Sequence, residues 1–233
     1  MINIVMLVKD RPELTRQALE SLIANTITPA NLTIVDDESE HLIADSGIFD
    51  CFAATILMIR RSKGITGQAR NLGVYWAEKY WGRGDWLYLS DNDVYFTERW
   101  DLKLVRAARL FEPGLRLLGG ATHPFHGTNQ AIAQDGWIDN LQWQAKVHTH
   151  DAVSGYSQLM RWKTWDEYGP LAANAPGVAQ SEDWAFCQEI IKDGGLVGSI
   201  YPEVVYDCGL TNTFGEPTTG AGAIIRRRGI LQL

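Results

Sequence analysis

"INIVMLVKDRPELTRQALESLIAN", residues 2–25, is a strand pattern followed directly by a helix pattern. The run Ile2–Val8 is apolar except for Asn3 and rich in β-branched residues, which is typical of a strand buried on both faces of a parallel sheet. Pro12 suits the first turn of a helix, and apolar residues recur every four positions from Leu14 to Leu22. This stretch therefore predicts the first strand–helix unit of an α/β domain.

The same alternation continues through the next seventy residues. Strands are predicted at 32–39 ("LTIVDDES"), 54–61 ("ATILMIRR") and 85–93 ("DWLYLSDND"), and a helix is predicted at 67–81 ("GQARNLGVYWAEKYW"). Strands and helices that alternate at this spacing favour a mainly parallel central sheet flanked by helices.

The second half of the chain is less regular. Its clearest element is a helix predicted at 181–195, "SEDWAFCQEIIKDGG", with Ser181 as the N-cap and Gly194 at its end. The sequence contains no internal repeat and no low-complexity linker, so we expect both halves to form one compact unit.

Composition narrows the class of protein. The 233 residues are 45% hydrophobic and carry a formal net charge of −7, which disfavours a strongly basic nucleic-acid-binding surface. Three cysteines, Cys51, Cys187 and Cys208, have no paired spacing and fit a reducing compartment. The apolar opening is too short for a signal sequence or a membrane span, so we expect a cytoplasmic protein without a transmembrane segment.

Acidic residues follow two of the predicted strands, Asp36–Asp37 after the second and Asp91 and Asp93 after the fourth. The carboxyl ends of parallel strands gather where α/β sheets bind ligands. Two carboxylates suit a hard divalent cation whose remaining ligands are substrate phosphates and water. The alternative is an ordinary turn, since Asp and Asn favour turns after strands.

Five motifs, taken together, resemble the family-2 glycosyltransferases of the GT-A fold. They are "INIVMLVKDRPELTRQALESLIANT", "LTIVDDES", "GQARNLGVYWAEKYW", "WLYLSDNDVYF" and "SEDWAFCQEI", in the order found in that family. The resemblance is strong over residues 2–100 and looser over 150–210. It implies a GT-A, nucleotide-diphospho-sugar transferase fold with a smaller acceptor-side region.

The resemblance also implies how the domain is organised. Residues 1–233 would form a single GT-A domain, with a nucleotide-sugar-binding half at 1–100 and an acceptor-side half at 101–210. Residues 211–233 would form a mobile C-terminal tail or lid, and Arg226–Arg228 within it could close over phosphates or contact an anionic acceptor.

On the donor side, the residues that match the family's pattern are Val8, Asp36, Asp37, Arg70, Asp91 and Asp93. The resemblance implies that Asp37 hydrogen-bonds the nucleotide base, with Asp36 beside it, and that Arg70 lies near the diphosphate. Asp91 would lie near the ribose and the metal, and Asp93 would ligate Mn²⁺ or Mg²⁺ directly. For Arg70, the alternatives are a solvated charge on a helix face and a structural ion pair with one of the acids.

On the acceptor side, Asp183 of "SEDW" matches the family's catalytic base, with Glu182 as the second choice. Inverting transfer requires a carboxylate that takes the proton of the acceptor hydroxyl. Trp184 is expected to contribute to the acceptor side together with Glu182. The alternative is that both acids stabilise the first turn of a helix, where negative charge complements the helix dipole.

The chain departs from the family pattern where many relatives have a metal-binding histidine. The corresponding segment, "EVVYDCGLTNTFG", offers Asp207 and Cys208, and of these only Asp207 suits a hard cation. Asp207 is therefore the third candidate metal ligand, beside Asp91 and Asp93. His123 and His126 are alternative polar groups near the cleft, although ordinary hydrogen-bonded histidines explain them equally well.

These observations predict a metal-dependent inverting glycosyltransferase, of hexosyltransferase-like family-2 type, with a UDP-sugar as the most favoured donor. The acceptor is expected to be a saccharide or another hydroxyl compound, and a hydroxymethylated base in DNA is an alternative. A non-catalytic module that binds sugar nucleotides or glycans is a further alternative. A nucleotidyltransferase would require a glycine-rich loop after the first strand, which "VKDRPEL" lacks.

Overall fold

The computed structural model describes residues 1–40, 56–61, 66–120, 136–138, 143–172 and 182–208. The strands are β1 (Ile2–Val8), β2 (Ala30–Asp37), β3 (Ile56–Arg61), β4 (Trp86–Asp91), β5 (Val94–Phe96), β6 (Leu115–Gly119), β7 (Gly136–Ile138), β8 (Trp143–Thr149), β9 (Ser157–Arg161), β10 (Leu196–Tyr201) and β11 (Val205–Asp207). The helices are α1 (Pro12–Asn25), α2 (Thr66–Trp81), α3 (Trp100–Leu110), α4 (Trp162–Tyr168) and α5 (Glu182–Lys192).

The central sheet has nine strands in the order β3-β2-β1-β4-β9-β6-β10-β8-β7. The first four strands are parallel, as predicted, and their register aligns Val8 with Asp36 and Leu7 with Asp91. The carboxyl ends of β1, β2 and β4 therefore meet at one edge, which is where a parallel sheet presents its ligand site.

The other half of the sheet is mixed. Strand β9 pairs antiparallel with both β4 and β6, and β10 is parallel to β6 but antiparallel to β8. The parallel character predicted for the sheet thus holds for its N-terminal part, while the sheet as a whole is mixed. Because β9 comes late in the chain and pairs with β4, it carries the segment before it to the carboxyl end of β4.

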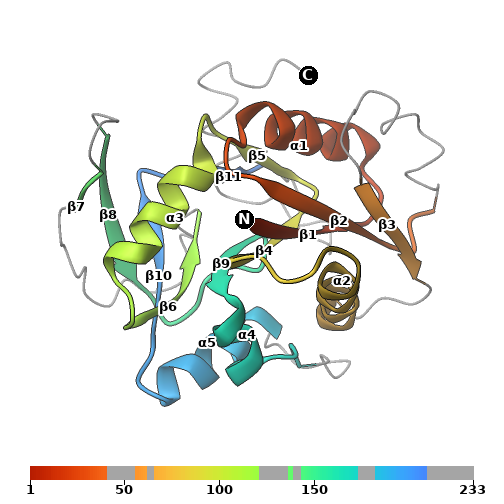
Figure 1. Cartoon of the computed structure of the whole chain (residues 1–233). Helices are drawn as coiled ribbons and strands as arrows, with labels where there is room; N and C mark the ends of the chain where they lie inside the picture. The colour runs from red at the N-terminus through yellow and green to blue at the C-terminus, as the bar shows by residue number, and fades with distance from the viewer. Residues whose placement is uncertain (41–55, 62–65, 121–135, 139–142, 173–181, 209–233) are drawn as a thin grey trace.

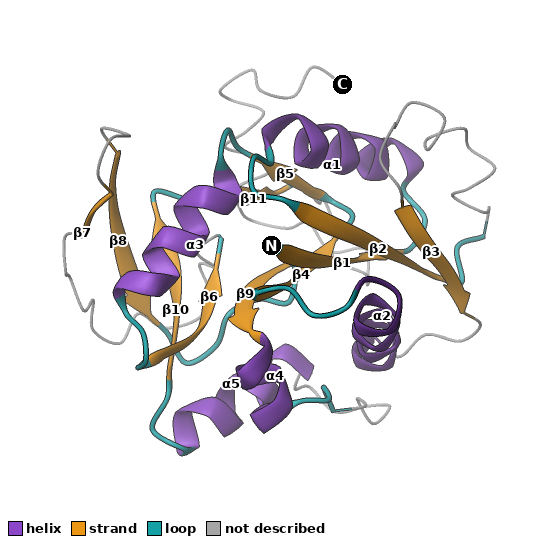
Figure 2. Ribbon diagram, viewed as in Figure 1, coloured by secondary structure: helices purple, strands orange, loops and turns teal. Residues whose placement is uncertain are grey.

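Helices cover both faces of the sheet, with α1 and α3 on one face and α2, α4 and α5 on the other (Figures 1 and 2). Side chains of β1 alternate between the two cores: Met6 packs on the α1 side, and Val5 and Leu7 pack on the α2 side. This double burial explains why the strand is apolar at every position except Asn3.

A glycine sets how closely α2 packs on the sheet. A Cβ atom at Gly73 would lie only 2.8 Å from Cγ2 of Val35 and would also collide with Val5, so a larger residue would push the helix outward. Close packing here fixes the first turns of α2, which carry the buried side chains of Ala69 and Arg70 toward the ligand edge of the sheet.

A separate two-stranded sheet joins β5 to β11. The strands are antiparallel and align Val94 with Asp207, and the Cys208 backbone N–H donates a hydrogen bond to the Asp93 carbonyl at 2.7 Å. This pairing brings the end of the described chain beside the turn that carries Asp91 and Asp93.

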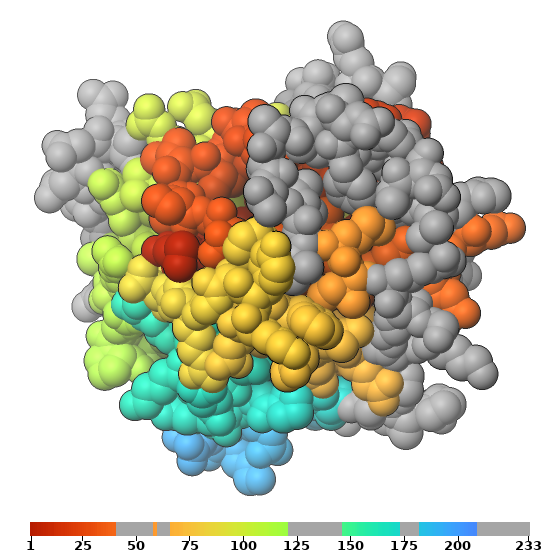
Figure 3. Space-filling model, turned by 45° about the vertical axis from the view of Figure 1, so that its right-hand side comes forward, coloured from red at the N-terminus to blue at the C-terminus, as the bar shows by residue number. Residues whose placement is uncertain are grey.

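On the outer surface, the segment after α2 adjoins α4 (Figure 3), and Arg83 forms a bidentate ion pair with Asp166 there, with N–O distances of 2.7 and 2.9 Å. None of the helices in the described part of the chain is both long and apolar enough to cross a membrane.

Candidate functional site

Hydrogen bonds of Asp10 and Asp36 connect the loop that follows β1 to the loop that follows β2. The Ser39 backbone N–H donates to Oδ1 of Asp36 at 3.0 Å, and Oγ of Ser39 accepts from the Asp10 N–H at 2.9 Å. Oδ1 of Asp10 in turn accepts from the Glu40 N–H at 2.7 Å. Asp36 is fully buried, and its carboxylate fixes the backbone of Ser39, the residue that contacts Asp10.

The other two donor-side predictions at this edge, Val8 and Asp37, are also buried. Val8 is the last residue of β1, and Asp37 is the last residue of β2, one position beyond the register partner of Val8. The prediction that these residues share one edge of the sheet agrees with their placement, whereas their contact with a nucleotide stays a prediction.

The turn after β4 is held by its middle residue. Nδ2 of Asn92 donates to the Asp10 carbonyl at 3.0 Å and to Oγ1 of Thr15 at 2.7 Å. The turn is therefore bound to the loop between β1 and α1, and β4 ends at Asp91, two residues earlier than predicted. In that loop Asp10 and Arg11 adopt left-handed backbone conformations, with φ of 52° and 58°, which are uncommon for residues other than glycine.

Asp93 lies in an electronegative environment. Burial and the neighbouring carboxylates of Asp91 and Asp207 raise the pKa of Asp93 to about 7, although the ion pair with the Arg11 guanidinium opposes this shift. The carboxylates predicted as metal ligands thus lie near one another, and their mutual repulsion is what a cation would relieve.

The donor set fits a hard cation only in part. Carboxylate oxygens are the ligands that Mn²⁺ and Mg²⁺ prefer, but within the described ranges no three His, Cys, Asp or Glu side chains lie together closely enough to hold a metal ion. Such a cation would therefore rely on phosphate oxygens and water as well as on Asp93 and its neighbours.

Arg70 joins the two sides of the site. Its Nη2 donates to Oδ1 of Asp91 at 2.7 Å, and its Nη1 donates to Oε1 of Glu182 at 2.9 Å. The Arg70 side chain is 3% exposed. Burial lowers the pKa of Arg70, but the carboxylates of Asp91 and Glu182 outweigh burial and hold that pKa above its ordinary value. The structural ion pair, one of the interpretations drawn from sequence, is present, whereas contact of Arg70 with a diphosphate stays a prediction.

Asp183 begins the acceptor side. Its Oδ2 accepts a hydrogen bond from the Gly155 backbone N–H at 2.8 Å, and its Oδ1 accepts from the Trp184 N–H at 2.8 Å. Asp183 is only partly buried, as a group that exchanges protons with an acceptor needs to be. Glu182, predicted on the same side, is buried against Arg70, and Trp184 packs on the core beneath α5.

The structure brings together Asp91, Asp93, Asp207, Arg70 and Asp183 at the carboxyl ends of the parallel strands. His123, His126, Ser181 and Arg226–Arg228 lie outside the described residues.

Sequence reasoning missed Arg11, Asn92 and Gly155. The only available signal was that Asn92 stands between two candidate ligands, and glycine and arginine at the other positions have many ordinary explanations.

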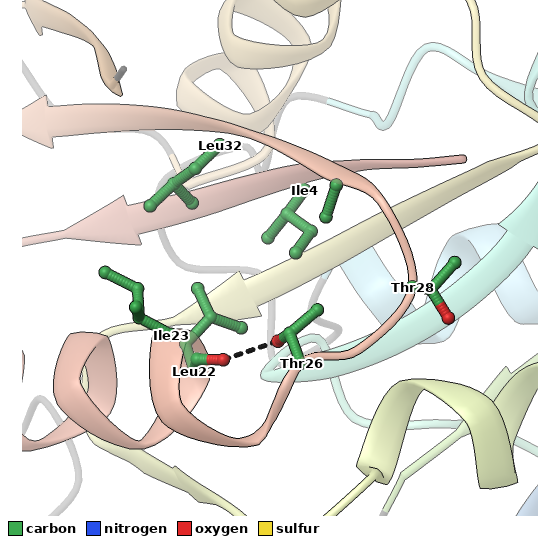
Figure 4. A pocket seen from close by; sticks show the side chains of 7 residues that line it. Ile4, Leu22, Ile23, Thr26, Thr28 and Leu32 are labelled. Carbon is green, nitrogen blue, oxygen red and sulfur yellow. Dashed lines mark hydrogen bonds between the residues drawn. The ribbon is translucent and has the colours of Figure 1, made fainter. Parts of the chain in front are cut away.

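A hollow of about 190 Å³ lies elsewhere, between α1 and the start of β2 (Figure 4). Apolar side chains such as Leu22, Ile23 and Leu32 form most of its wall. It lies toward the amino-terminal ends of the strands, away from the carboxylates described above, and it offers no charged side chain for a nucleotide.

Comparison with solved structures finds the same fold in glycosyltransferases. A mannosyltransferase from Pyrobaculum calidifontis, PcManGT, in complex with GDP-Man and Mn²⁺, aligns with a TM-score of 0.58 at 10% identity, over 85% of this chain and 56% of its own. GalNAc-T7 with UDP, GalNAc and Mn²⁺ aligns with a TM-score of 0.62 at 16% identity, over 86% of this chain and 43% of its own. Residues 1–349 of S. aureus TarS align with a TM-score of 0.56 at 15% identity, over 88% of this chain and 59% of that one.

The chain thus spans about half the length of these structures, and at such identities the likeness concerns the fold alone. No curated protein matches the sequence. The model of glycosyl transferase family 2 matches residues 3–120, just over half of the chain. This match agrees with the resemblance seen in the motifs, and the chain belongs to glycosyl transferase family 2.

Proposed function

We propose that the protein is a metal-dependent inverting glycosyltransferase that moves a sugar from a nucleotide-diphosphate donor to an acceptor hydroxyl. The observation that carries this proposal is the guanidinium of Arg70, which bonds Asp91 on one side and Glu182, the neighbour of Asp183, on the other. Asp91, with Asp93 beside it, therefore lies on one side of the Arg70 guanidinium, and the partly exposed carboxylate of Asp183 lies on the other side. Complexes of PcManGT and GalNAc-T7 with nucleotides and Mn²⁺ support this choice of ligands.

The donor we propose is a UDP-sugar. Asp37, at the end of β2, would accept the N3–H of the base. Asp93, with Asp91 and Asp207 as the further candidate ligands, would hold the cation together with diphosphate oxygens and water. When bound, Mn²⁺ or Mg²⁺ would offset the diphosphate charge and act as a Lewis acid toward the leaving nucleotide. The raised pKa of Asp93 supports this, because the site repels a second uncompensated negative charge.

The base we propose is Asp183. Its carboxylate would take the proton of the acceptor hydroxyl while the acceptor oxygen forms a bond to the anomeric carbon of the sugar. The bond from that carbon to the diphosphate oxygen breaks, and its electron pair leaves with the nucleotide diphosphate. A single displacement of this kind inverts the anomeric configuration. The backbone N–H groups of Gly155 and Trp184 orient the carboxylate for this step.

The acceptor we propose is a saccharide or another hydroxyl compound. The net charge of −7 disfavours DNA as the acceptor, because binding to a phosphate backbone depends on clustered positive charge. A panel of saccharides and a hydroxymethylated oligonucleotide, offered together with each donor, would separate the two classes.

The test is a screen of sugar nucleotides with Mn²⁺ or Mg²⁺, followed by thermal shift and by release of the nucleotide. We expect at least one UDP-sugar to stabilise the protein only when metal is present. Asp93→Ala should lose this stabilisation, whereas Asp183→Asn should keep it and lose transfer. Asp193→Asn, an exposed change just beyond the same helix, is the control. The proposal fails if no nucleotide stabilises the protein with any metal.

A further inference from the structure

The starting observation is that the Arg70 guanidinium is buried and that both of its terminal nitrogens bond carboxylates, while its Nε has no hydrogen-bond partner among the described residues. Its two terminal nitrogens bond carboxylates from two elements, Asp91 at the end of β4 and Glu182 in the first turn of α5. The side chains of Arg70 and Glu182 are 3% and 6% exposed. The bond to Glu182 is buried and the bond to Asp91 is partly buried, so a phosphate at either terminal nitrogen would compete with a charge-assisted hydrogen bond that is already in place.

We propose that Arg70 and Glu182 form a positioning bridge, which fixes Asp91 on the metal side and the start of α5, and thus Asp183, on the acceptor side. In this assignment Arg70 binds no phosphate and Glu182 accepts no proton from the substrate. The inference rests on the proposed function for what the two ends do, but the bridge itself is a property of the folded chain.

Gly155 connects the bridge to the candidate base. A Cβ atom at this position would lie 2.7 Å from Nη2 and 2.8 Å from Cζ of Arg70, so only glycine leaves room for the guanidinium. The N–H of the same residue donates to Oδ2 of Asp183 at 2.8 Å. The backbone at Gly155 is therefore packed against Arg70 on one side and hydrogen-bonded to Asp183 on the other, so the position of the guanidinium affects that of the carboxylate.

The charges of the bridge give it a measurable signature. One guanidinium faces two carboxylates, so the group of Arg70, Asp91 and Glu182 keeps a net negative charge when all three are ionised. Neutralising Glu182 would leave Asp91 as the remaining strong partner of Arg70 and would make the region less negative. The first effect makes Asp91 less available to a bound cation and the second weakens the attraction of that cation to the site, although Glu182 itself touches no metal in this scheme.

The first measurement is the binding of Mn²⁺ alone to the full chain, followed by electron paramagnetic resonance. We expect Glu182→Gln to bind Mn²⁺ roughly fivefold more weakly than the unmodified protein, because a nearby negative charge is lost. Glu189→Gln removes the same charge from an exposed position on the same helix and should leave binding unchanged. Equal binding by the two variants would overturn the proposal.

The second measurement is a double-mutant cycle in urea, which needs neither donor nor acceptor. Arg70→Met leaves the buried carboxylate of Glu182 without its cation, and Glu182→Gln removes one of the two carboxylates that compensate the buried Arg70, so each should lower the unfolding midpoint. The double variant should lose much less than the two single losses added together, because its members act through one contact. Additive losses would overturn the bridge, whether or not the protein transfers sugar.

The third measurement separates the bridge from direct roles in the reaction, with UDP as the probe at saturating Mn²⁺. If Arg70 bound the diphosphate, Glu182→Gln would free the guanidinium and UDP would bind more tightly. If Glu182 were the base, this variant would abolish transfer while Mn²⁺ binding stayed normal. The bridge predicts that UDP binding is not tightened and that kcat falls about tenfold with little change in the donor KM, as expected for a misplaced base.

Discussion

Two arginines meet the acids of the "SDND" turn, and they do so in different surroundings. Arg70 reaches Asp91 from the buried face of α2, and the two side chains are 3% and 32% exposed. Arg11 reaches Asp93 from a loop in the left-handed conformation, and the side chains of that pair are 33% and 18% exposed. The chemistry of the two pairs is the same, but the arginine is buried in the first pair and partly exposed in the second.

The difference indicates which acid of the turn is fixed and which can change its partner. Removal of one member of a buried ion pair leaves an uncompensated charge, so such a pair holds its geometry. A pair that water can reach is worth little, because solvent replaces either partner. We therefore infer that Asp91 is anchored, because its partner Arg70 is buried and also bonds the buried Glu182, whereas the partly exposed Arg11 can leave Asp93 when a cation arrives.

The largest effect is expected at the buried pair. Arg70→Met leaves Asp91 and Glu182 facing one another without a cation, so we expect a loss of about 3–5 kcal/mol in the free energy of unfolding. Urea denaturation at neutral pH measures this loss. Arg70→Lys keeps the charge but not the two-pronged geometry, and its loss should lie between zero and that of Arg70→Met. A loss under about 1 kcal/mol for Arg70→Met would show that the pair is not an anchor.

A second, smaller effect is expected behind the same guanidinium. Gly155→Ala places a methyl group against Nη2 and Cζ of Arg70, and overpacking of this kind costs about 1–3 kcal/mol. Gly114→Ala is the matched control, because its Cβ would meet its nearest neighbours at an ordinary 3.7 Å. Thermal denaturation compares the stability of the two variants. Equal losses of stability would mean that the structure can accommodate a methyl group at Gly155.

The anchored part of the site is also the part that could be predicted from sequence. Ile2–Val8 and the apolar run that ends at Asp91 are local patterns, and the end of a buried parallel strand places its acids without knowledge of the rest of the fold. The ion pair of Arg70 is one of the interpretations that the sequence allows, because the acids at the ends of the predicted strands are expected near the helix that carries Arg70.

The remainder depended on contacts between distant residues. Strand β9 inserts antiparallel beside β4, and short strands such as β11 have too few residues to show a period. Asn92 binds Asp10 across 82 positions, and Gly155 binds Asp183 across 28. No local pattern records such a contact, so the roles of Asn92 and Gly155 required the folded structure.

The partly exposed ion pair of Arg11 and Asp93 should respond to mutation in a different way from the pair of Arg70 and Asp91. Arg11→Gln should change the free energy of unfolding by less than about 1 kcal/mol, because the lost arginine is partly exposed and Asp93, with its raised pKa, can take up a proton when it loses this partner. At the same time Mn²⁺ should bind about threefold more tightly, since a competing positive charge is removed from Asp93. Titration with Mn²⁺ and urea denaturation of the same variant check both parts. A large loss of stability, or weaker binding of Mn²⁺, would remove the distinction between the two arginines.

The smallest effect tests whether burial or geometry makes the difference. Arg83 forms a bidentate pair with Asp166 and a further bond to Glu78 at 2.7 Å, which is better geometry than either pair at the site, yet its side chain is 42% exposed. Its hydrogen bonds to Asp166 and Glu78 raise the pKa of Arg83, but solvent screens most of that interaction. Arg83→Gln should therefore cost less than about 1 kcal/mol in urea denaturation, and added salt should reduce the difference further. A cost close to that of Arg70→Met would mean that hydrogen-bond geometry, and not exclusion of water, makes Arg70 an anchor.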